Sequence, residues 1–122
     1  MIELFAALIQ DPPPPIIEYR QPNSGAIEAT WDCRGRQVRY RIETEWDRVR
    51  LVSYSGAAGP ASDADLARIN EALAPIWVIG GVTFLCTAEA DNLGITGPRK
   101  GGGGDAWISA RWYDGELHLR SH

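Results

Sequence analysis

Residues 26–54, "AIEATWDCRGRQVRYRIETEWDRVRLVSY", decide the fold because apolar and polar side chains alternate along most of their length. Such alternation is typical of strands that bury one face and expose the other. A tight turn at Arg34-Gly35 would pair Trp31 with Val38, Ala29 with Tyr40 and Ile27 with Ile42. A four-residue loop over 44–47 would then pair Ile42 with Val49 and Tyr40 with Leu51. The stretch therefore predicts a three-stranded antiparallel meander with one apolar face.

A helix is expected to follow this meander and to pack across its apolar face. Ser62 and Asp65 form a capping-box pattern, and Asp63 adds favourable charge to the first helical turn. Leu66, Ile69 and Leu73 form a narrow apolar stripe, and Pro75 ends the helix.

A buried strand and a hairpin are expected in the last third of the chain. The run "VTFLCT", 82–87, is typical of a buried strand. Asp114-Gly115 favours a type I′ turn, which would set Trp112 opposite Leu117 and Arg111 opposite His118. We therefore predict a single α+β domain over 1–122, with a meander and a C-terminal β-hairpin packed on one main helix.

The N-terminal segment predicts a short docked helix over 2–9, with a strand as the alternative. Pro12–Pro15 favour a polyproline II spacer over a ligand for a proline-reading domain. The apolar run is short and carries Glu3, which argues against a signal peptide or a membrane span. The expected location is therefore the cytoplasm. Cys33 and Cys86 are predicted as buried thiols, with a disulfide as the alternative.

The run "GITGPRKGGGGDAW", 94–107, suggests a phosphate-binding loop at first sight. A P-loop, however, needs its lysine after the glycine spacing and a helix directly behind it. Here Lys100 precedes the glycines and a strand-like segment follows. We expect a flexible glycine-rich loop over 88–105, in which Arg99 and Lys100 could approach an acidic partner.

Metal binding and catalysis have little support in the sequence. His118 and His122 have a spacing that suits zinc on a helix, but on a strand it separates them by about 13 Å. The polar face of the hairpin brings together Trp107, Ser109, Arg111, His118, Arg120 and His122. An imidazole beside guanidinium groups could bind or act on an anionic substrate, but no second titrating group is evident. We expect no catalytic residue, no metal site and no cofactor.

The polar face of the meander carries the most prominent basic set, namely Arg39, Arg41, Arg48 and Arg50. In the expected register Glu28 faces Arg41, Glu43 faces Arg48, and Arg50 lies near Arg41 with no partner. Arginine is favoured at interfaces because its planar guanidinium binds carboxylates and phosphates in two-point fashion.

Three functions are compatible with these features. The first is a non-catalytic protein-binding module, such as an inhibitor or a toxin-neutralising immunity protein of bacterial or phage type, which uses arginine and tryptophan on a sheet face. The second is a nucleic-acid or nucleotide binder, although the formal net charge of -4 opposes it. The third is a small enzyme acting on an anionic substrate at Arg111 and His118. The sequence indicates no membrane partner and does not set the oligomeric state.

Overall fold

The computed structural model of the chain describes residues 16–19, 25–46 and 48–122, with side chains for 26–46 and 48–122. The helix expected over 2–9 and the spacer at 12–15 lie outside these residues. The described elements are β1 (Ile16–Tyr19), β2 (Gly25–Cys33), β3 (Arg36–Glu45), β4 (Arg48–Gly56), β5 (Gly59–Pro60), α2 (Asp63–Leu73), β6 (Gly81–Cys86), β7 (Asp91–Pro98), β8 (Asp105–Tyr113) and β9 (Glu116–Ser121).

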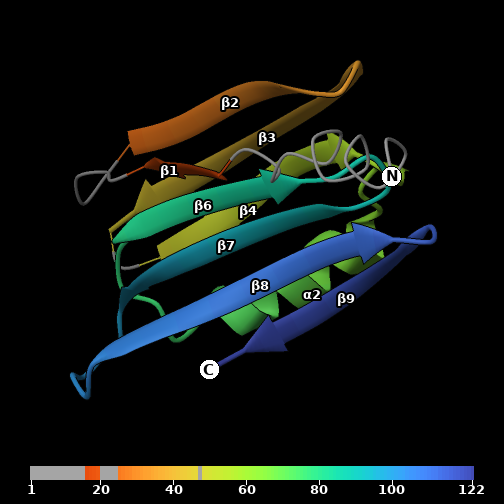
Figure 1. Cartoon of the computed structure of the whole chain (residues 1–122). Coiled ribbons are helices and arrows are strands. Elements are labelled where there is room, and N and C mark those ends of the chain that lie inside the picture. The colour runs from red at the N-terminus through yellow and green to blue at the C-terminus, as the bar shows by residue number, and fades with distance from the viewer. Residues whose placement is uncertain (1–15, 20–24, 47) are drawn as a thin grey trace, which may run out of the picture.

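The strands form two antiparallel sheets (Figure 1). Sheet B has the order β2-β3-β4-β5, and sheet A has the order β1-β6-β7-β8-β9. Most of the described chain is therefore β-structure with one helix, which agrees with a small α+β domain in outline. The described helix is too short to cross a membrane.

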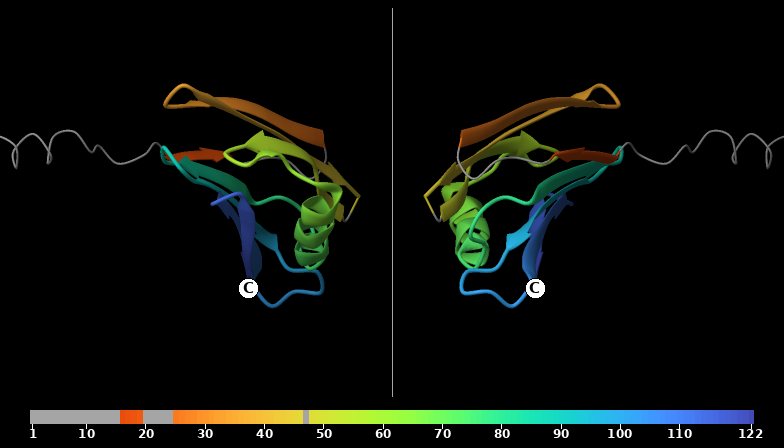
Figure 2. Two further views of the ribbon diagram at one scale, coloured as in Figure 1. Left: turned by 90° about the vertical axis from the view of Figure 1, so that its right-hand side faces the viewer. Right: turned by 90° about the vertical axis from the view of Figure 1, so that its left-hand side faces the viewer.

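The core lies between the two sheets and is closed on one side by α2. Tyr40 of sheet B contacts Phe84 of sheet A, and the ring of Tyr54 stacks on Trp112 with centroids 3.8 Å apart. In Figure 2 the helix lies beside β4 and close to β8 and β9, and all three strands contact it. Ile69 and Leu73 of α2 are buried in this contact.

The expected helix is confirmed, including its cap. The Ser62 hydroxyl accepts a hydrogen bond from the main-chain N–H of Asp65 at 3.1 Å. Asn70 adds a contact that the apolar stripe did not predict. Its side-chain amide accepts from the N–H of Leu51 at 2.7 Å and donates to the carbonyl of Leu51 at 3.0 Å. The Asn70 side chain thus satisfies the hydrogen-bonding N–H and C=O groups of Leu51 in β4, as the main chain of a neighbouring strand would.

Two of the predicted hairpins have the predicted register. In the β2–β3 hairpin Trp31 lies opposite Val38 and Ile27 opposite Ile42. In the β8–β9 hairpin Arg111 lies opposite His118, and Asp114 and Gly115 both have the positive φ of a type I′ turn.

The predicted pairing of β3 with β4 is wrong by two residues at Ile42 and by three at Tyr40. Ile42 lies opposite Leu51 and Tyr40 opposite Tyr54, because only two residues connect the strands and the register shifts after Arg41. The shift leaves Val52 without an opposite residue, so both Leu51 and Tyr54 face the core. As a result Glu43 faces Arg50, Glu45 faces Arg48, and Arg41 faces Ser53.

The loop predicted over 88–105 contains an eight-residue strand. β7 occupies 91–98 in the middle of sheet A, where Leu93 and Ile95 are buried. Only the turn after β7 is glycine-rich, and Gly101–Gly104 all have positive φ, which glycine adopts at little cost. The prediction was wrong because it took the glycines as a loop signal, although Leu93, Ile95 and Gly97 alternate with polar or small residues as in a strand.

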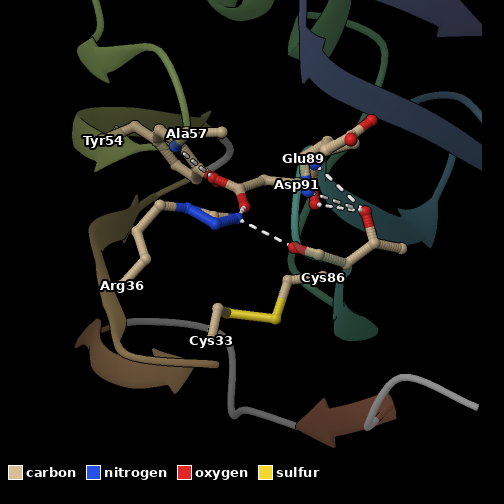
Figure 3. A network of polar contacts seen from close by, with 9 residues as sticks. Cys33, Arg36, Tyr54, Ala57, Cys86, Glu89 and Asp91 are labelled. Carbon is tan, nitrogen blue, oxygen red and sulfur yellow. Dashed lines mark hydrogen bonds and ion pairs between the residues drawn. A yellow bond between two sulfur atoms is a disulfide. The ribbon is translucent and has the colours of Figure 1, made fainter. Parts of the chain in front are cut away.

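The prediction of two free thiols is also wrong, because Cys33 and Cys86 form a disulfide (Figure 3). It joins the end of β2 in sheet B to the end of β6 in sheet A. A separation of 53 residues gave no sign of this in the sequence, since only the packing of the sheets brings the two ends together.

Replacing both cysteines with alanine should lower the free energy of unfolding by about 4 kcal/mol, because the bridge closes a long loop in the unfolded chain. Urea denaturation of Cys33→Ala/Cys86→Ala measures the loss. The wild-type protein under a reductant is the matched control and should lose a similar amount. Equal stability of the variant and the oxidised wild type would contradict the cross-link.

Candidate functional site

A buried polar cluster lies beside the disulfide, centred on the carboxylate of Asp91 (Figure 3). Asp91 is 0% exposed and pairs with the guanidinium of Arg36. Its Oδ2 accepts hydrogen bonds from the Tyr54 hydroxyl at 2.8 Å and from the N–H of Ala57 at 2.7 Å. Arg36 also donates to the carbonyl of Thr87 at 3.2 Å. The cluster therefore joins sheet B to the start of β7.

The cluster is tightly packed on the side of Gly56. A Cβ atom on Gly56 would collide with Oδ2 of Asp91 and press on the ring of Tyr54. Burial, with a further contribution from the Asp91 charge, raises the pKa of Tyr54 well above its ordinary value, so the phenol stays protonated as a donor. We interpret the cluster as a structural contact between the sheets.

The outer face of the meander is close to electrically balanced. Its four predicted arginines, at 39, 41, 48 and 50, share this face with four carboxylates, those of Glu28, Asp32, Glu43 and Glu45. Arg41 contacts both Glu28 at 2.5 Å and Glu43 at 2.9 Å, which raises the pKa of its guanidinium. Arg39 donates to the side chain of Gln37 at 3.2 Å. This face offers little net charge to a partner.

Sheet A carries a different kind of surface at its β9 end. A hollow of about 500 Å³ is lined by three arginines and one histidine, together with five other residues, none of which bears a carboxylate. We call it the basic hollow; its lining is Arg68, Asn92, Ser109, Arg111, Tyr113, Leu117, His118, Leu119 and Arg120. It brings together three residues that the sequence singled out, Arg111, His118 and Arg120, and adds Arg68 from α2.

Ring contacts order the centre of the basic hollow. The rings of Tyr113 and His118 stack with centroids 3.9 Å apart and planes 11° apart. The guanidinium carbon of Arg111 lies 4.9 Å from the centroid of Tyr113. The Nε2 atom of His118 is buried and has no hydrogen-bond partner among the described residues. The ring is therefore held in place with one polar atom unused.

A second, more apolar hollow adjoins the first one on the same face. It has about 300 Å³, shares Asn92 and Ser109 with the basic hollow, and is bordered by Leu85 and the ring of Trp107. Gly94 leaves the space open, because a Cβ there would make only ordinary contacts with Thr83. We call it the Gly94 hollow. Trp107, singled out from the sequence, is 40% exposed at its rim.

Arg99 and Lys100 belong to neither hollow. They lie at the base of the glycine turn, where the N–H of Arg99 donates to Gly104 and that of Lys100 to Pro75, each at 2.9 Å. The Arg99 side chain donates to the carbonyl of Asp105 at 3.4 Å. The structure therefore anchors the two residues that were expected to sit in a mobile loop.

The described residues hold no group of three or more histidine, cysteine or acidic side chains that could ligate a metal. His118 is stacked on Tyr113 and His122 on Trp107, with centroids 6.1 Å apart in the second pair. The hydroxyl of Ser109 donates to Asn92 at 2.8 Å. In the basic hollow His118 has guanidinium neighbours but no carboxylate to orient it as a base.

Sequence reasoning missed Arg68, Asn92, Gly94 and Asp91. The last three lie in a strand that was predicted to be a loop, so their faces could not be assigned. The signal was present, because Asp91 is in phase with the apolar Leu93 and Ile95. Arg68 could not have been placed from sequence, since its role depends on how α2 packs against β9.

No match to a protein-family model, to a curated protein or to a solved structure was found for the chain. Its function therefore has to be argued from the side chains themselves.

Replacing Asp91 with asparagine should destabilise the protein by about 3–5 kcal/mol, because it leaves the charge of Arg36 without its carboxylate at a partly buried position. Glu89→Gln removes an exposed carboxylate two residues away and is the matched control, with an expected change within about 0.5 kcal/mol. Thermal and urea unfolding measure both. Similar stability of the two variants would show that the buried pair contributes little.

Tyr54→Phe should cost about 1–3 kcal/mol at neutral pH, because Asp91 loses a buried donor. Because the pKa of Tyr54 is raised by folding, the phenol's contribution to the free energy of unfolding is fully present below the ordinary tyrosine pKa of 10.0. It declines above that pH, where only the unfolded chain ionises. Above pH 10 the wild type should therefore lose up to about 1.4 kcal/mol per pH unit more than Tyr54→Phe. Parallel stability curves for the two proteins in alkali would refute the argument.

Proposed function

We propose that the protein is a non-catalytic binding module that docks on an acidic surface of a larger partner protein and blocks it, in the manner of an inhibitor or immunity protein. The docking face is the outer side of sheet A, where the basic hollow adjoins the Gly94 hollow. The observation that carries this proposal is the basic hollow itself, in a chain of net charge -4. Its lining gathers Arg68, Arg111 and Arg120 and contains no carboxylate, although Asp65 of α2 lies 4.0 Å from Arg68 outside the lining.

This face fits a partner better than the meander does. A guanidinium that already contacts carboxylates, as Arg41 does, has less to gain from a partner's carboxylate. Arg111 and Arg120 lie on β8 and β9, and no carboxylate lines the hollow beside them, so an incoming carboxylate would supply the missing charge. The interface would therefore centre on sheet A, with the arginines of the meander outside it.

The adjoining Gly94 hollow favours a protein over a nucleic acid. Protein interfaces combine an apolar centre with a polar rim, and Trp and Arg often dominate their binding energy. Here Leu85 and Trp107 border the apolar space and Arg111 and Arg120 lie in the basic hollow next to it. An apolar side chain of the partner would enter the first hollow while its acidic residues meet the second.

The disulfide bears on where this binding would take place. Structural disulfides persist in oxidising surroundings and are rare in the cytosol. A cytoplasmic location was expected because the N-terminal run does not resemble a signal peptide, and the Cys33–Cys86 bridge weighs against that expectation. We propose an oxidising compartment, such as the periplasm or the cell exterior, as the setting in which the partner is met.

Binding should fail when the docking face is altered. The partner is isolated from the source cell with the tagged protein, and its affinity is measured by titration calorimetry. Arg111→Glu/Arg120→Glu and Gly94→Phe should each weaken binding by at least about tenfold, the first by charge repulsion and the second by filling the hollow. All three positions face outward, so melting temperatures should stay close to that of the wild type.

Arg39→Glu/Arg48→Glu is the matched control, because it reverses two charges on the meander face. Its affinity should stay within about twofold of the wild type. A loss confined to this control would place the interface on the meander and overturn the proposal. Tight binding to single-stranded RNA or DNA that falls steeply with salt, and that Arg111→Glu/Arg120→Glu abolishes, would replace it with the nucleic-acid alternative.

A further inference from the structure

We infer that the partner is engaged by strand addition: an extended segment with alternating apolar and acidic residues pairs antiparallel with the free edge of β9. This inference rests on the proposed function and names the form of the bound segment. Among the strands of the described ranges, β9 is the last of sheet A and pairs with β8 alone. Antiparallel pairing continues the pattern of the whole sheet.

The main-chain groups on this edge can be assigned residue by residue. Trp107 and His122 exchange both of their hydrogen bonds, at 2.9 Å each, so they form a hydrogen-bonded pair. Because such pairs alternate with non-bonded ones, Arg120 and His118 also bond to β8. Leu117, Leu119 and Ser121 therefore direct their N–H and C=O groups away from β8, toward the open edge.

Space for a segment exists beside these same residues. The basic hollow is lined by Leu117 and Leu119 as well as by the arginines. A further hollow of about 450 Å³, lined by Arg68, Glu71, Ala72, Pro75, Leu119 and Ser121, lies between the C-terminal half of α2 and β9. A strand on this edge would turn every second side chain toward Leu119 and Ala72, and the others toward Arg120 and His118.

The two sides of the edge require different residues. Leu119 and Ala72 are partly buried apolar side chains that pack on the core, so the inner positions suit valine-sized apolar residues. The outer positions would lie opposite His118 and Arg120 in the closer, non-bonded pairs, where opposite charges stabilise. Carboxylates therefore fit the outer positions.

Charge also favours an acidic segment over a second copy of this chain at the β9 edge, and favours the β9 edge over the β2 edge for such a segment. A second copy of β9 paired antiparallel about Leu119 would set Arg120 against His118 of the other chain and bring the six arginines of the two hollows together. Edge strand β2 exposes Glu28 and Asp32 on its outer side, which would repel an acidic segment. The β9 edge, by contrast, attracts one.

The test uses an acetylated peptide of alternating valine and glutamate as the probe. Amide hydrogen exchange and chemical shifts of the labelled full chain are followed by NMR. In the free protein the amides of Leu117, Leu119 and Ser121 should exchange fast and those of His118 and Arg120 slowly. The peptide should protect the first three, and the affinity should fall as salt is raised.

Backbone N-methylation supplies the matched controls. An antiparallel segment would direct the N–H groups of its valines at β9 and those of its glutamates at solvent. N-methylation of the valines should weaken binding by at least about tenfold, and N-methylation of the glutamates should leave it nearly unchanged. On the protein side Ser121→Pro removes one edge N–H and should weaken binding, whereas Ser121→Ala should not.

Different results would overturn different claims. If Arg111→Glu/Arg120→Glu abolishes peptide binding but methylated valines do not, the acidic docking stands and strand addition fails. If methylated glutamates block binding and methylated valines do not, the antiparallel arrangement fails. Protection of Leu119 that grows with protein concentration in the absence of peptide would assign the edge to a second copy. If charge reversal affects neither the peptide nor the partner, the proposed function fails as well.

Discussion

A carboxylate that leaves water on folding has to be met by donors, and Asp91 of sheet A meets three from the part of the chain that builds sheet B. Because Arg36, Tyr54 and Ala57 reach it from β3, β4 and the turn after β4, the two sheets can approach each other in few ways. The disulfide beside it joins β2 to β6 and closes the same end of the core. On the other side of the core, α2 lies between β4 and the pair β8 and β9 (Figure 2). The position of β9 as an open edge next to a helix follows from this arrangement.

The parts of the fold that could be predicted are those in which local rules agree with one another. In β2 and β3 the alternation, the Arg34-Gly35 turn and the burial of Val38 and Ile42 all indicate one register. The same agreement between a turn dipeptide and its flanking residues fixes the β8–β9 hairpin, and the Ser62 cap fixes the start of α2. These elements supply Arg111, His118 and Arg120, so three of the four basic residues of the hollow could be predicted from the sequence.

The remaining parts depend on contacts between segments far apart in the chain. The β3–β4 register shifts because Leu51 and Tyr54, three residues apart, both face the core, and Asn70 of the helix bonds to Leu51 at that point. Strict alternation cannot express such a bulge. Asp91 was missed for a related reason, since a buried carboxylate makes sense only when Arg36 and Tyr54 are seen beside it. The Cys33–Cys86 bridge likewise needs both sheets in place.

Most arginines on the outer face of sheet B lie opposite carboxylates, whereas those of sheet A do not, and this difference connects the fold to the proposed binding. On sheet B the strands pair basic with acidic residues, as Glu43 with Arg50 and Glu45 with Arg48, so the outer face is neutralised by its own register. On sheet A the residues opposite Arg111 and Arg120 are His118 and Ser109, which add no negative charge. Proteins usually protect an edge strand with a proline, a bulge or an inward-pointing charge, and β9 pairs with β8 without a register shift and turns two leucines inward. An edge that has none of these protections, but repels its own copies by charge, is suited to receive a foreign acidic strand.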